Sequence, residues 1–276
     1  RLPFPFPFEP PNLPAGITFL SGRKRMKKLM TATAIAAISA GAAFALWTAY
    51  RYFPAGTTFL VVVDPGVGSA RHPIAVDAGG FRFVGPDNGV FGEVLAELGD
   101  FQAAAIDITQ AIPEGLSGTF HGRDLFAPTA ARLACGTPLT EIGASLDRLV
   151  PLPPALLHIA DQTIDGEIIY IDHFGNVVSS IGLCHWQPDG MLRLTPRLQP
   201  DAASRTLDPA QVTIHAGGRT YTHIARTYAA VEPGEATALI NSAGMLEIAV
   251  NQGSARQTLG LAPGDRITVR LTSTPA

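Results

Sequence analysis

The sequence predicts two domains: an α/β N-terminal domain with a mixed or parallel sheet and flanking helices, followed by an all-β, barrel-like C-terminal domain. The chain has 276 residues, of which 46% are hydrophobic, which suffices for about two domains with buried cores. Strands alternate with helices up to about residue 150, a pattern typical of an α/β layer. Short β-rich runs separated by Gly, Pro, Asn and Asp then fill residues 160–276, which predicts antiparallel strands in a barrel or sandwich.

The first 45 residues differ from the rest of the chain. Residues 1–22 contain PFPFPFEPPNLP, and this run predicts disorder because proline lacks the N–H that helices and central strands need. Residues 23–45 place a basic cluster before an uncharged run that ends in Ala43-Phe44-Ala45, the layout of a secretory signal peptide. An alanine-rich buried helix fits the same residues. The uncharged run is short for a bilayer core of about 30 Å, so a membrane-spanning helix is disfavoured.

Residues 46–150 carry the α/β pattern of the predicted catalytic domain. The run TTFLVVV at 57–63 is β-branched and apolar, and it predicts a strand buried on both faces. Glycines, polar turn residues and helical periodicity place the other elements. These are strands at 74–76 and 81–84 around a Gly79-Gly80 turn, a loop at 85–89 leading into a helix through Leu98, a strand at 102–109 and a helix at 122–134 before Gly136.

Charge and cysteine content exclude several classes of protein. The net charge is -3 and both signs are scattered, so the chain lacks the basic stripe that binding to nucleic acid requires. Cys135 and Cys184 lie far apart without the spacing of a zinc site or a disulfide framework. We therefore expect both to be buried free thiols.

The stretch VVVDPGVGSARHP places Asp64 at the end of a predicted parallel strand, where open α/β sheets commonly carry functional groups. The Pro65-Gly66-Val67-Gly68 turn lets the backbone approach a ligand without obstruction by Cβ atoms. A third glycine opening a helix and a Lys-Ser/Thr pair are both missing, which argues against dinucleotide and P-loop sites. Arg71 can return past the turn toward Asp64, either as part of a site or as a plain structural ion pair.

A second group of ionisable residues lies in TFHGRDLF at 119–126. His121 precedes Gly122, and Arg123 and Asp124 stand at the start of the predicted helix, where a carboxylate suits the helix dipole. Crowding these groups at one junction disfavours folding unless they are used, which makes His121 a candidate site residue rather than an ordinary surface histidine. The sequence does not show whether His121 faces Asp64.

Five stretches together resemble the successive signatures of the S-adenosyl-L-methionine (SAM) hydroxide adenosyltransferase family, the SAM hydrolases related to fluorinase and chlorinase. They are VVVDPGVGSARHPIAV, FVGPDNGVF, TFHGRDLFAPTAARLACG, IDHFGNVVSSI and INSAGMLEIAVNQGSA. The resemblance runs in family order from about residue 45 to the C-terminus. It implies the same two domains, a homotrimer with active sites between subunits, and SAM as the small-molecule substrate.

The resemblance also implies a reaction. Family hydrolases split SAM into adenosine and L-methionine by attack of water or hydroxide on the ribose C5′, and the implied catalytic trio matches Asp64, Arg71 and His121. It implies no cofactor and no metal. The halogenase branch is an alternative, but it carries uncharged residues in the turn, and the Asp64 carboxylate would repel a halide.

Substrate contacts are implied in the C-terminal domain. Asp172 matches the family residue that binds the methionine ammonium, and Asn176 matches the residue that reads the adenine edge through a donor and an acceptor. Phe174 and Tyr228 match aromatic residues beside the purine, and Ser242 matches the residue that holds the methionine carboxylate. Core packing is the alternative for both aromatic residues, and turn formation is the alternative for Asn176.

One departure from the family pattern concerns the N-terminus. Family members begin with a strand whose aspartate binds both ribose hydroxyls, whereas no aspartate precedes Asp64 here. The chain therefore resembles a family member with an altered, apparently truncated N-terminus. A catalytically impaired SAM- or adenosine-binding protein is the alternative to an active hydrolase. The family is usually cytoplasmic, while the signal-peptide interpretation of residues 26–45 would place the protein in the periplasm or outside the cell.

Overall fold

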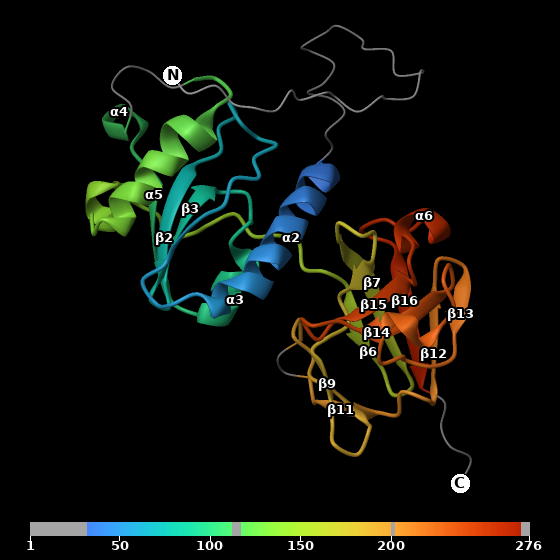
Figure 1. The fold of residues 1–276 in the computed structure, drawn as a ribbon. Helices are drawn as coiled ribbons and strands as arrows, with labels where there is room; N and C mark the ends of the chain where they lie inside the picture. The colour runs from blue at the N-terminus through green and yellow to red at the C-terminus, as the bar shows by residue number, and fades with distance from the viewer. Residues whose placement is uncertain (1–31, 112–116, 200–201, 272–276) are drawn as a thin grey trace, which may run out of the picture.

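The protein is represented by a computed structural model that describes residues 32–111, 117–199 and 202–271. The Pro-rich segment 1–22 and the basic cluster at 23–28 lie outside the described residues. Figure 1 shows a layered α/β part and a β-rich part, with helix α2 between them. The predicted fold class is confirmed: a mixed sheet with flanking helices precedes a barrel-like antiparallel sheet.

The N-terminal elements combine strands with helices, and three strands, β1, β2 and β3, follow one another before α3. They are α2 (Ala32–Ala49), η1 (Tyr50–Tyr52), β1 (Thr58–Leu60), β2 (Pro73–Ala78), β3 (Phe81–Pro86), α3 (Gly92–Leu98), β4 (Phe101–Ile106), α4 (Ile108–Ala111), the π-helical turn η2 (Gly122–Phe126), α5 (Ala127–Ala134), η3 (Leu139–Glu141) and β5 (Gly143–Ser145).

The C-terminal elements are almost all strands. They are β6 (Leu157–Ile159), β7 (Thr163–Ile171), β8 (Val177–Ser179), β9 (Cys184–Trp186), β10 (Leu192–Leu194), β11 (Arg205–Leu207), β12 (Val212–Ala216), β13 (Arg219–Tyr221), η4 (Tyr228–Ala230), β14 (Ala236–Ile240), β15 (Leu246–Val250), α6 (Ala255–Leu259) and β16 (Arg266–Leu271).

The N-terminal sheet has the strand order β1-β3-β2-β4-β5. Strands β2 and β3 form a hairpin through Gly79 and Gly80, whose φ angles of 57° and 80° are those that a tight two-residue turn requires. Only β1 runs parallel to its neighbour β3, and the other pairings are antiparallel. Asp64 therefore does follow a parallel strand, as the sequence predicts.

The prediction that residues 57–63 form a strand buried on both faces was wrong. Strand β1 is shorter, and among the described residues it pairs on one side only, with β3. Leu60 is 44% exposed as a result. Apolar, β-branched composition indicates a strand, but it does not reveal whether the strand lies at the edge or in the centre of its sheet.

Alternating side chains of the sheet form cores on both of its faces. Ile74, Val76 and Phe83 pack with α2 and α3 on one face. Ala75 and Val84 pack with η2 and α5 on the other, next to Phe126 and Leu133. This period of two is what a strand covered on both sides requires. The layers thereby hold the segment after β1 and the start of η2 close to each other.

The C-terminal strands form an eight-stranded, antiparallel, barrel-like sheet that contains β6 and runs β13-β12-β16-β7-β8-β15-β14. A three-stranded sheet, β11-β10-β9, lies beside it. Along β7, buried Ile164, Gly166 and Ile168 alternate with partly exposed residues, so one face of the strand points into the core. All five residues of β15 are buried, which marks it as a central strand.

Helix α2 joins the two parts of the molecule. Its residues Phe44 and Trp47 share a core with Val178 of β8 and with Met245, and the Phe44 ring lies 5.4 Å from that of Tyr170. The described part of the segment with signal-peptide features is thus a helix that packs on both domains. Among the described residues, no helix is both long and apolar enough to cross a membrane.

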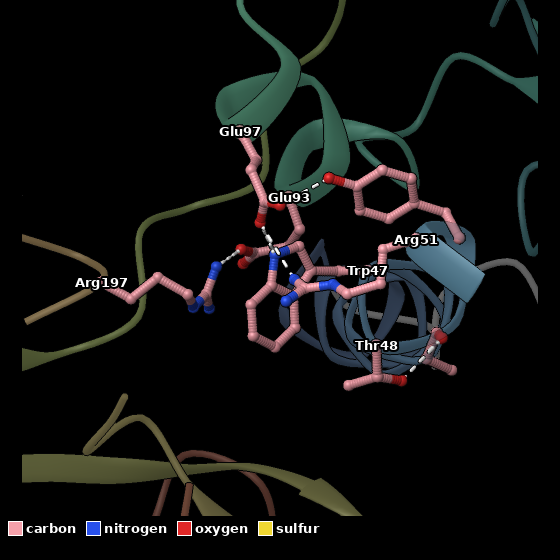
Figure 2. A network of polar contacts seen from close by, with 8 residues as sticks. Trp47, Thr48, Arg51, Glu93, Glu97 and Arg197 are labelled. Atoms are coloured by element: carbon pink, nitrogen blue, oxygen red, sulfur yellow. Dashed lines mark hydrogen bonds and ion pairs between the residues drawn. The ribbon is translucent and has the colours of Figure 1, made fainter. Parts of the chain in front are cut away.

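A polar network fixes the end of α2 to α3 (Figure 2). Glu97 accepts hydrogen bonds from Trp47 Nε1 and from the Tyr50 hydroxyl, both at 2.5 Å. Arg197, from the loop after β10, pairs with Glu93 of α3 and lies over the Trp47 ring, 4.5 Å from its centroid. The network therefore links the β-rich part to the α/β part through α2 and α3.

The expectation of two buried thiols was half wrong. Cys184 is buried in the barrel core, whereas Cys135 is exposed at the end of α5. The helix turns Leu133 toward the sheet, and Cys135 lies past the last helical residue, beyond its buried face. Cysteine is usually buried, but here its place on the helix decides its exposure.

Candidate active site

The turn after β1 brings Asp64 and Arg71 together. The Ser69 N–H donates to the Gly66 carbonyl at 3.0 Å, and Gly68 has a positive φ of 75°. A Cβ atom on Gly66 would stand 3.7 Å from both the Asp64 carboxylate and the Arg71 side chain. Both distances are ordinary van der Waals contacts, so it is the return of the chain through the turn that brings Arg71 to Asp64, as the sequence allows.

The Asp64–Arg71 pair is bidentate and buried. Arg71 Nε donates to Asp64 Oδ1 at 2.8 Å, and Arg71 Nη2 donates to Oδ2. The side chains are only 10% and 6% exposed for Arg71 and Asp64, respectively. The Arg71 guanidinium also lies over the Phe126 ring of η2, 5.2 Å from its centroid. This two-point contact fixes the orientation of the carboxylate far better than a single charge would.

His121 completes this group from the start of η2. Its Nδ1 lies 3.1 Å from Arg71 Nη2. Because a guanidinium only donates, Nδ1 accepts this hydrogen bond, and the imidazole is then the neutral tautomer with its proton on Nε2. The three residues that the sequence analysis singled out as a catalytic trio are therefore in contact, with Arg71 in the middle.

The neighbours of His121 are engaged elsewhere. Arg123 Nε donates to the Asp124 carboxylate at 2.5 Å, and this hydrogen bond is the main reason that the pKa of Asp124 is lowered. The Arg123 guanidinium also lies over the exposed ring of Phe120. The ionisable residues crowded together in the sequence thus form two pairs: Arg123 contacts Asp124, and His121 contacts Arg71.

Asp172 and Asn176 form one hydrogen-bonded loop between β7 and β8. Asp172 Oδ1 accepts from the backbone N–H groups of Phe174 and Asn176 at 2.8 and 2.9 Å, and Oδ2 accepts from Asn176 Nδ2 at 2.9 Å. Gly175 has a φ of 84°, and a Cβ there would collide with Ser254 Oγ at 2.1 Å. The loop is rigid at its base, while the Phe174 ring at its tip is 75% exposed.

Tyr228 lies in the electrostatic neighbourhood of this loop, and Ser242 lies in the turn between β14 and β15. The Tyr228 hydroxyl donates to Glu247 Oε1 at 3.0 Å. Burial, with the charge and hydrogen bond of Glu247 and the charge of Asp172, raises the pKa of Tyr228 to about 12. Ser242 follows β14 and lines a cavity of about 400 Å³ that also reaches Trp47 and Arg51. Three of the five predicted substrate contacts, Asp172, Asn176 and Tyr228, are therefore linked by hydrogen bonds or charge, while Phe174 projects from the loop and Ser242 lines the separate cavity.

The two groups of residues stand on different domains. Asp64, Arg71 and His121 belong to the α/β part, and the group from Asp172 to Ser242 belongs to the barrel. Within the part of the chain that the structure describes, no hydrogen bond or ion pair joins one group to the other. The same described residues include no cluster of three or more His, Cys, Asp or Glu side chains that could hold a metal ion.

The sequence matches two family models in the order of the two domains. Residues 31–143 match the SAM hydroxide adenosyltransferase N-terminal domain, and residues 166–268 match the SAM hydroxide adenosyltransferase C-terminal domain. The chain belongs to the SAM hydroxide adenosyltransferase family. The resemblance drawn from the sequence motifs is thereby confirmed.

Several characterised family proteins are similar to this chain. The (R)-S-adenosyl-L-methionine hydrolase of Salinispora tropica is 37% identical over 225 residues, covering 80% of this chain and 77% of that protein. The protein of the same name from Thermus thermophilus is 38% identical over 234 residues, covering 81% and 79%. A fluorinase from an Actinoplanes species is more distant, with 29% identity over 158 residues, covering 48% of this chain and 53% of the fluorinase.

The family fold is also seen in solved structures. An uncharacterized conserved protein from Thermotoga maritima superposes with a TM-score of 0.69 at 33% sequence identity, covering 85% of this chain and 84% of the other. A conserved hypothetical protein from Thermus thermophilus gives a TM-score of 0.62 at 34% identity, covering 85% and 82%. The chain therefore shares its fold with these two solved structures.

Sequence reasoning missed two residues of this family member that the structure places beside the predicted substrate contacts. Glu247 and Asn241 hydrogen-bond to each other and, through Glu247, to Tyr228. The signal was visible in the stretch LEIAV, where one acid interrupts an apolar strand. A buried carboxylate in such a run needs partners, and its position predicts them nearby.

Proposed function

We propose that the protein hydrolyses S-adenosyl-L-methionine to adenosine and L-methionine. The observation that carries this proposal is the contact of Arg71 with both Asp64 and His121. The proposal agrees with the similarity to other proteins. The hydrolases are 36–38% identical over about 80% of this chain, whereas the fluorinases are 28–29% identical over 48% of it. A carboxylate at position 64 also suits a water nucleophile better than a halide, which it would repel.

In the proposed reaction, a water oxygen forms a bond to the ribose C5′ while the bond from C5′ to the sulfonium sulfur breaks. The electron pair of that bond returns to sulfur, so that neutral methionine thioether leaves, and one proton of the water is released. Because the sulfonium is already a good leaving group, the protein's task is to strip, orient and polarise the water in line with the C–S bond.

The trio has the geometry for this task. Asp64 accepts a hydrogen bond from the water and takes up its proton, while the two-point contact with Arg71 keeps the carboxylate oriented. His121, with its proton on Nε2, donates toward the oxygen of the attacking water and orients it. Arg71 stabilises the hydroxide character that develops as the proton leaves.

The barrel residues supply the substrate contacts in this proposal. Asp172 binds the methionine ammonium, because a carboxylate can accept about four hydrogen bonds and the loop uses three. Asn176 reads the adenine edge, Phe174 and Tyr228 flank the purine, and Ser242 holds the methionine carboxylate. No cofactor takes part, since SAM itself is the substrate.

We further propose that the active site forms between subunits of a homotrimer. Two observations support this: the trio and the barrel group have no direct hydrogen bond within one described chain, and large apolar side chains next to each group are exposed. Phe120 and Val62 lie beside the trio, and Phe174 projects beside the barrel group. If these surfaces of two subunits contacted each other across an interface, the apolar side chains would be buried and the site would be closed to water.

The test is chromatography of purified protein incubated with SAM, with and without excess chloride. We expect adenosine and methionine in equal amounts and no 5′-chloro-5′-deoxyadenosine. Asp64→Asn is expected to lower kcat by at least about 100-fold, the usual effect of losing an acid–base group. Asp77→Asn is the matched control, because Asp77 also pairs with an arginine, Arg82 at 3.6 Å, but on the surface of the sheet. Full turnover by the Asp64 variant would contradict the mechanism.

A second candidate, a SAM- or adenosine-binding protein without turnover, is favoured by one observation. Residues 1–63 contain no aspartate, whereas the resemblance implies an acidic ribose contact before Asp64. Calorimetry with adenosine distinguishes the candidates. Binding without product formation would support the second, and equal adenosine and methionine would show that this contact is dispensable.

A further inference from the structure

Glu247 is a buried acid that the proposed mechanism does not use. It is the second residue of β15, is 3% exposed, and has buried Leu246 and Ile248 as neighbours. Its partners are neutral: Tyr228 donates to Oε1 and Asn241 Nδ2 donates to Oε2, both at 3.0 Å. Burial of a carboxylate without a paired cation disfavours folding, so a purely structural account of Glu247 is weak.

The strands beside Glu247 lead directly to the predicted substrate contacts. Glu247 is paired with Val178 of β8 on one side and with Leu239 of β14 on the other. Strand β8 begins immediately after Asn176, and β14 ends immediately before Asn241 and Ser242. Because both strands run antiparallel to β15, the loop before β8 lies toward one end of β15 and the turn after β14 toward the other, and Glu247 stands between them.

Asn241 transmits the contact to the turn that carries Ser242. Its Oδ1 accepts hydrogen bonds from the backbone N–H groups of Ala243 and Met245, each at 3.0 Å, while its Nδ2 donates to Glu247. The amide is thus used at both ends. Because Glu247 only accepts when ionised, it also fixes which end of the Asn241 amide faces the turn.

Electrostatics place Asp172 in the same neighbourhood. The charge of Asp172 contributes to the raised pKa values of both Tyr228 and Glu247. For Glu247, burial is the main cause, and the hydrogen bonds from Asn241 and Tyr228 act in the opposite direction. Two interacting carboxylates would favour a cationic ligand such as the sulfonium or the ammonium of SAM.

We infer that Glu247 is a positioning residue for SAM: it holds the Tyr228 ring and, through Asn241, fixes the Ser242 turn relative to the Asp172–Asn176 loop. This inference rests on the proposed function. It assigns Glu247 no contact with the reacting atoms, so it predicts an effect on substrate binding and not on the chemical step.

The test is Glu247→Gln, which keeps the volume but has a single acceptor oxygen and turns its NH₂ toward one of the two donors. We expect KM for SAM to rise about tenfold while kcat changes less than about twofold. This is the effect of losing one or two hydrogen bonds to the substrate or to the residues that position it. Glu167→Gln is the matched control, because Glu167 is another barrel carboxylate and accepts from the Leu156 N–H at 3.0 Å. Its KM and kcat should match those of the wild type.

An unchanged KM in a folded Glu247→Gln variant would overturn the inference, even if its melting temperature fell. Where this variant does not fold, Tyr228→Phe tests the same link by removing only the hydroxyl that Glu247 holds. It should raise KM, and an unchanged KM would overturn the inference. In the double variant the two effects should be less than multiplicative, because both remove one contact.

Adenosine affinity separates failure of this inference from failure of the proposed function. If the wild type binds adenosine but releases no methionine, hydrolysis is contradicted, and the inference is decided by whether Glu247→Gln weakens adenosine binding about tenfold. If the wild type neither turns over SAM nor binds adenosine, both are overturned.

Discussion

Arg71 Nη2 lies 3.1 Å from Nδ1 of His121, and the same guanidinium donates hydrogen bonds to both carboxylate oxygens of Asp64. The arginine therefore does more than neutralise a buried carboxylate. It sets the orientation of Asp64 and the tautomer of His121 together, so that one side chain organises the whole trio.

Arg71→Lys should separate charge from geometry. Lysine keeps the positive charge but presents a single ammonium, which cannot span both Asp64 oxygens and His121 Nδ1. We expect kcat to fall about 100-fold with a much smaller change in KM, because the loss concerns the attacking water. Steady-state assays of adenosine release provide the measurement. Arg82→Lys, on the surface pair with Asp77, is the control, and equal losses in both variants would count against a role for Arg71 in the chemistry.

Glu97 should matter for stability rather than activity. It accepts from Trp47 Nε1 and the Tyr50 hydroxyl, so that Glu97→Ala leaves two donors at the α2–α3 contact without their partner. We expect a loss of about 2–4 kcal/mol in the free energy of unfolding, measured by urea titration. Glu141→Ala, at an exposed residue of η3, should change it by less than about 0.5 kcal/mol. A similar loss in both variants would show that the network does not stabilise the junction.

The stability of the protein should depend on pH through Asp87. Burial raises the pKa of this carboxyl above its ordinary value, although its Oδ1 accepts from the Val150 N–H at 2.8 Å. The folded state then binds the proton more tightly than the unfolded state. The contribution of Asp87 to stability is therefore greatest below the unfolded pKa and declines as pH rises through the folded pKa.

Asp87→Asn keeps the acceptor for Val150 and removes the titration, so it supplies the reference for this effect. Unfolding in urea from about pH 3.5 to about pH 7 should show the wild type losing stability relative to the variant as pH rises. A difference that stays constant, or that grows in favour of the wild type, would contradict the raised pKa.

The two cysteines should react very differently. Cys135 is exposed, whereas Cys184 lies in the barrel core, where burial raises the pKa of its thiol to about 12. Since the thiolate is the reactive form, a thiol reagent at pH 8 should label Cys135 quickly and Cys184 only after unfolding. Mass spectrometry of the labelled peptides is the measurement. Early labelling of Cys184 would mean that the barrel opens readily in the native state.

Local sequence predicted the elements that depend on near neighbours. The Gly79-Gly80 hairpin, the helix that follows η2 and the turn between Asp64 and Gly68 all use glycine or helical periodicity within a few residues. The meeting of Asp64 with Arg71 was predictable for the same reason, because the turn returns the chain within seven positions. The crowded setting of His121 made it a candidate site residue. Its contact with Arg71 could not be predicted from the local sequence.

The sequence by itself determined the fold class, the family and the residue types of the candidate site, because hydrophobic periodicity, turn residues and five ordered motifs are local properties. Only the tertiary structure decided which of those residues meet. It brought His121 to Arg71 across 50 positions, placed β1 at a sheet edge, exposed Cys135 and set Glu247 between two strands that lead to the predicted substrate contacts. Such contacts depend on how layers pack, and packing is a property of pairs of surfaces distant in the chain that no local pattern encodes.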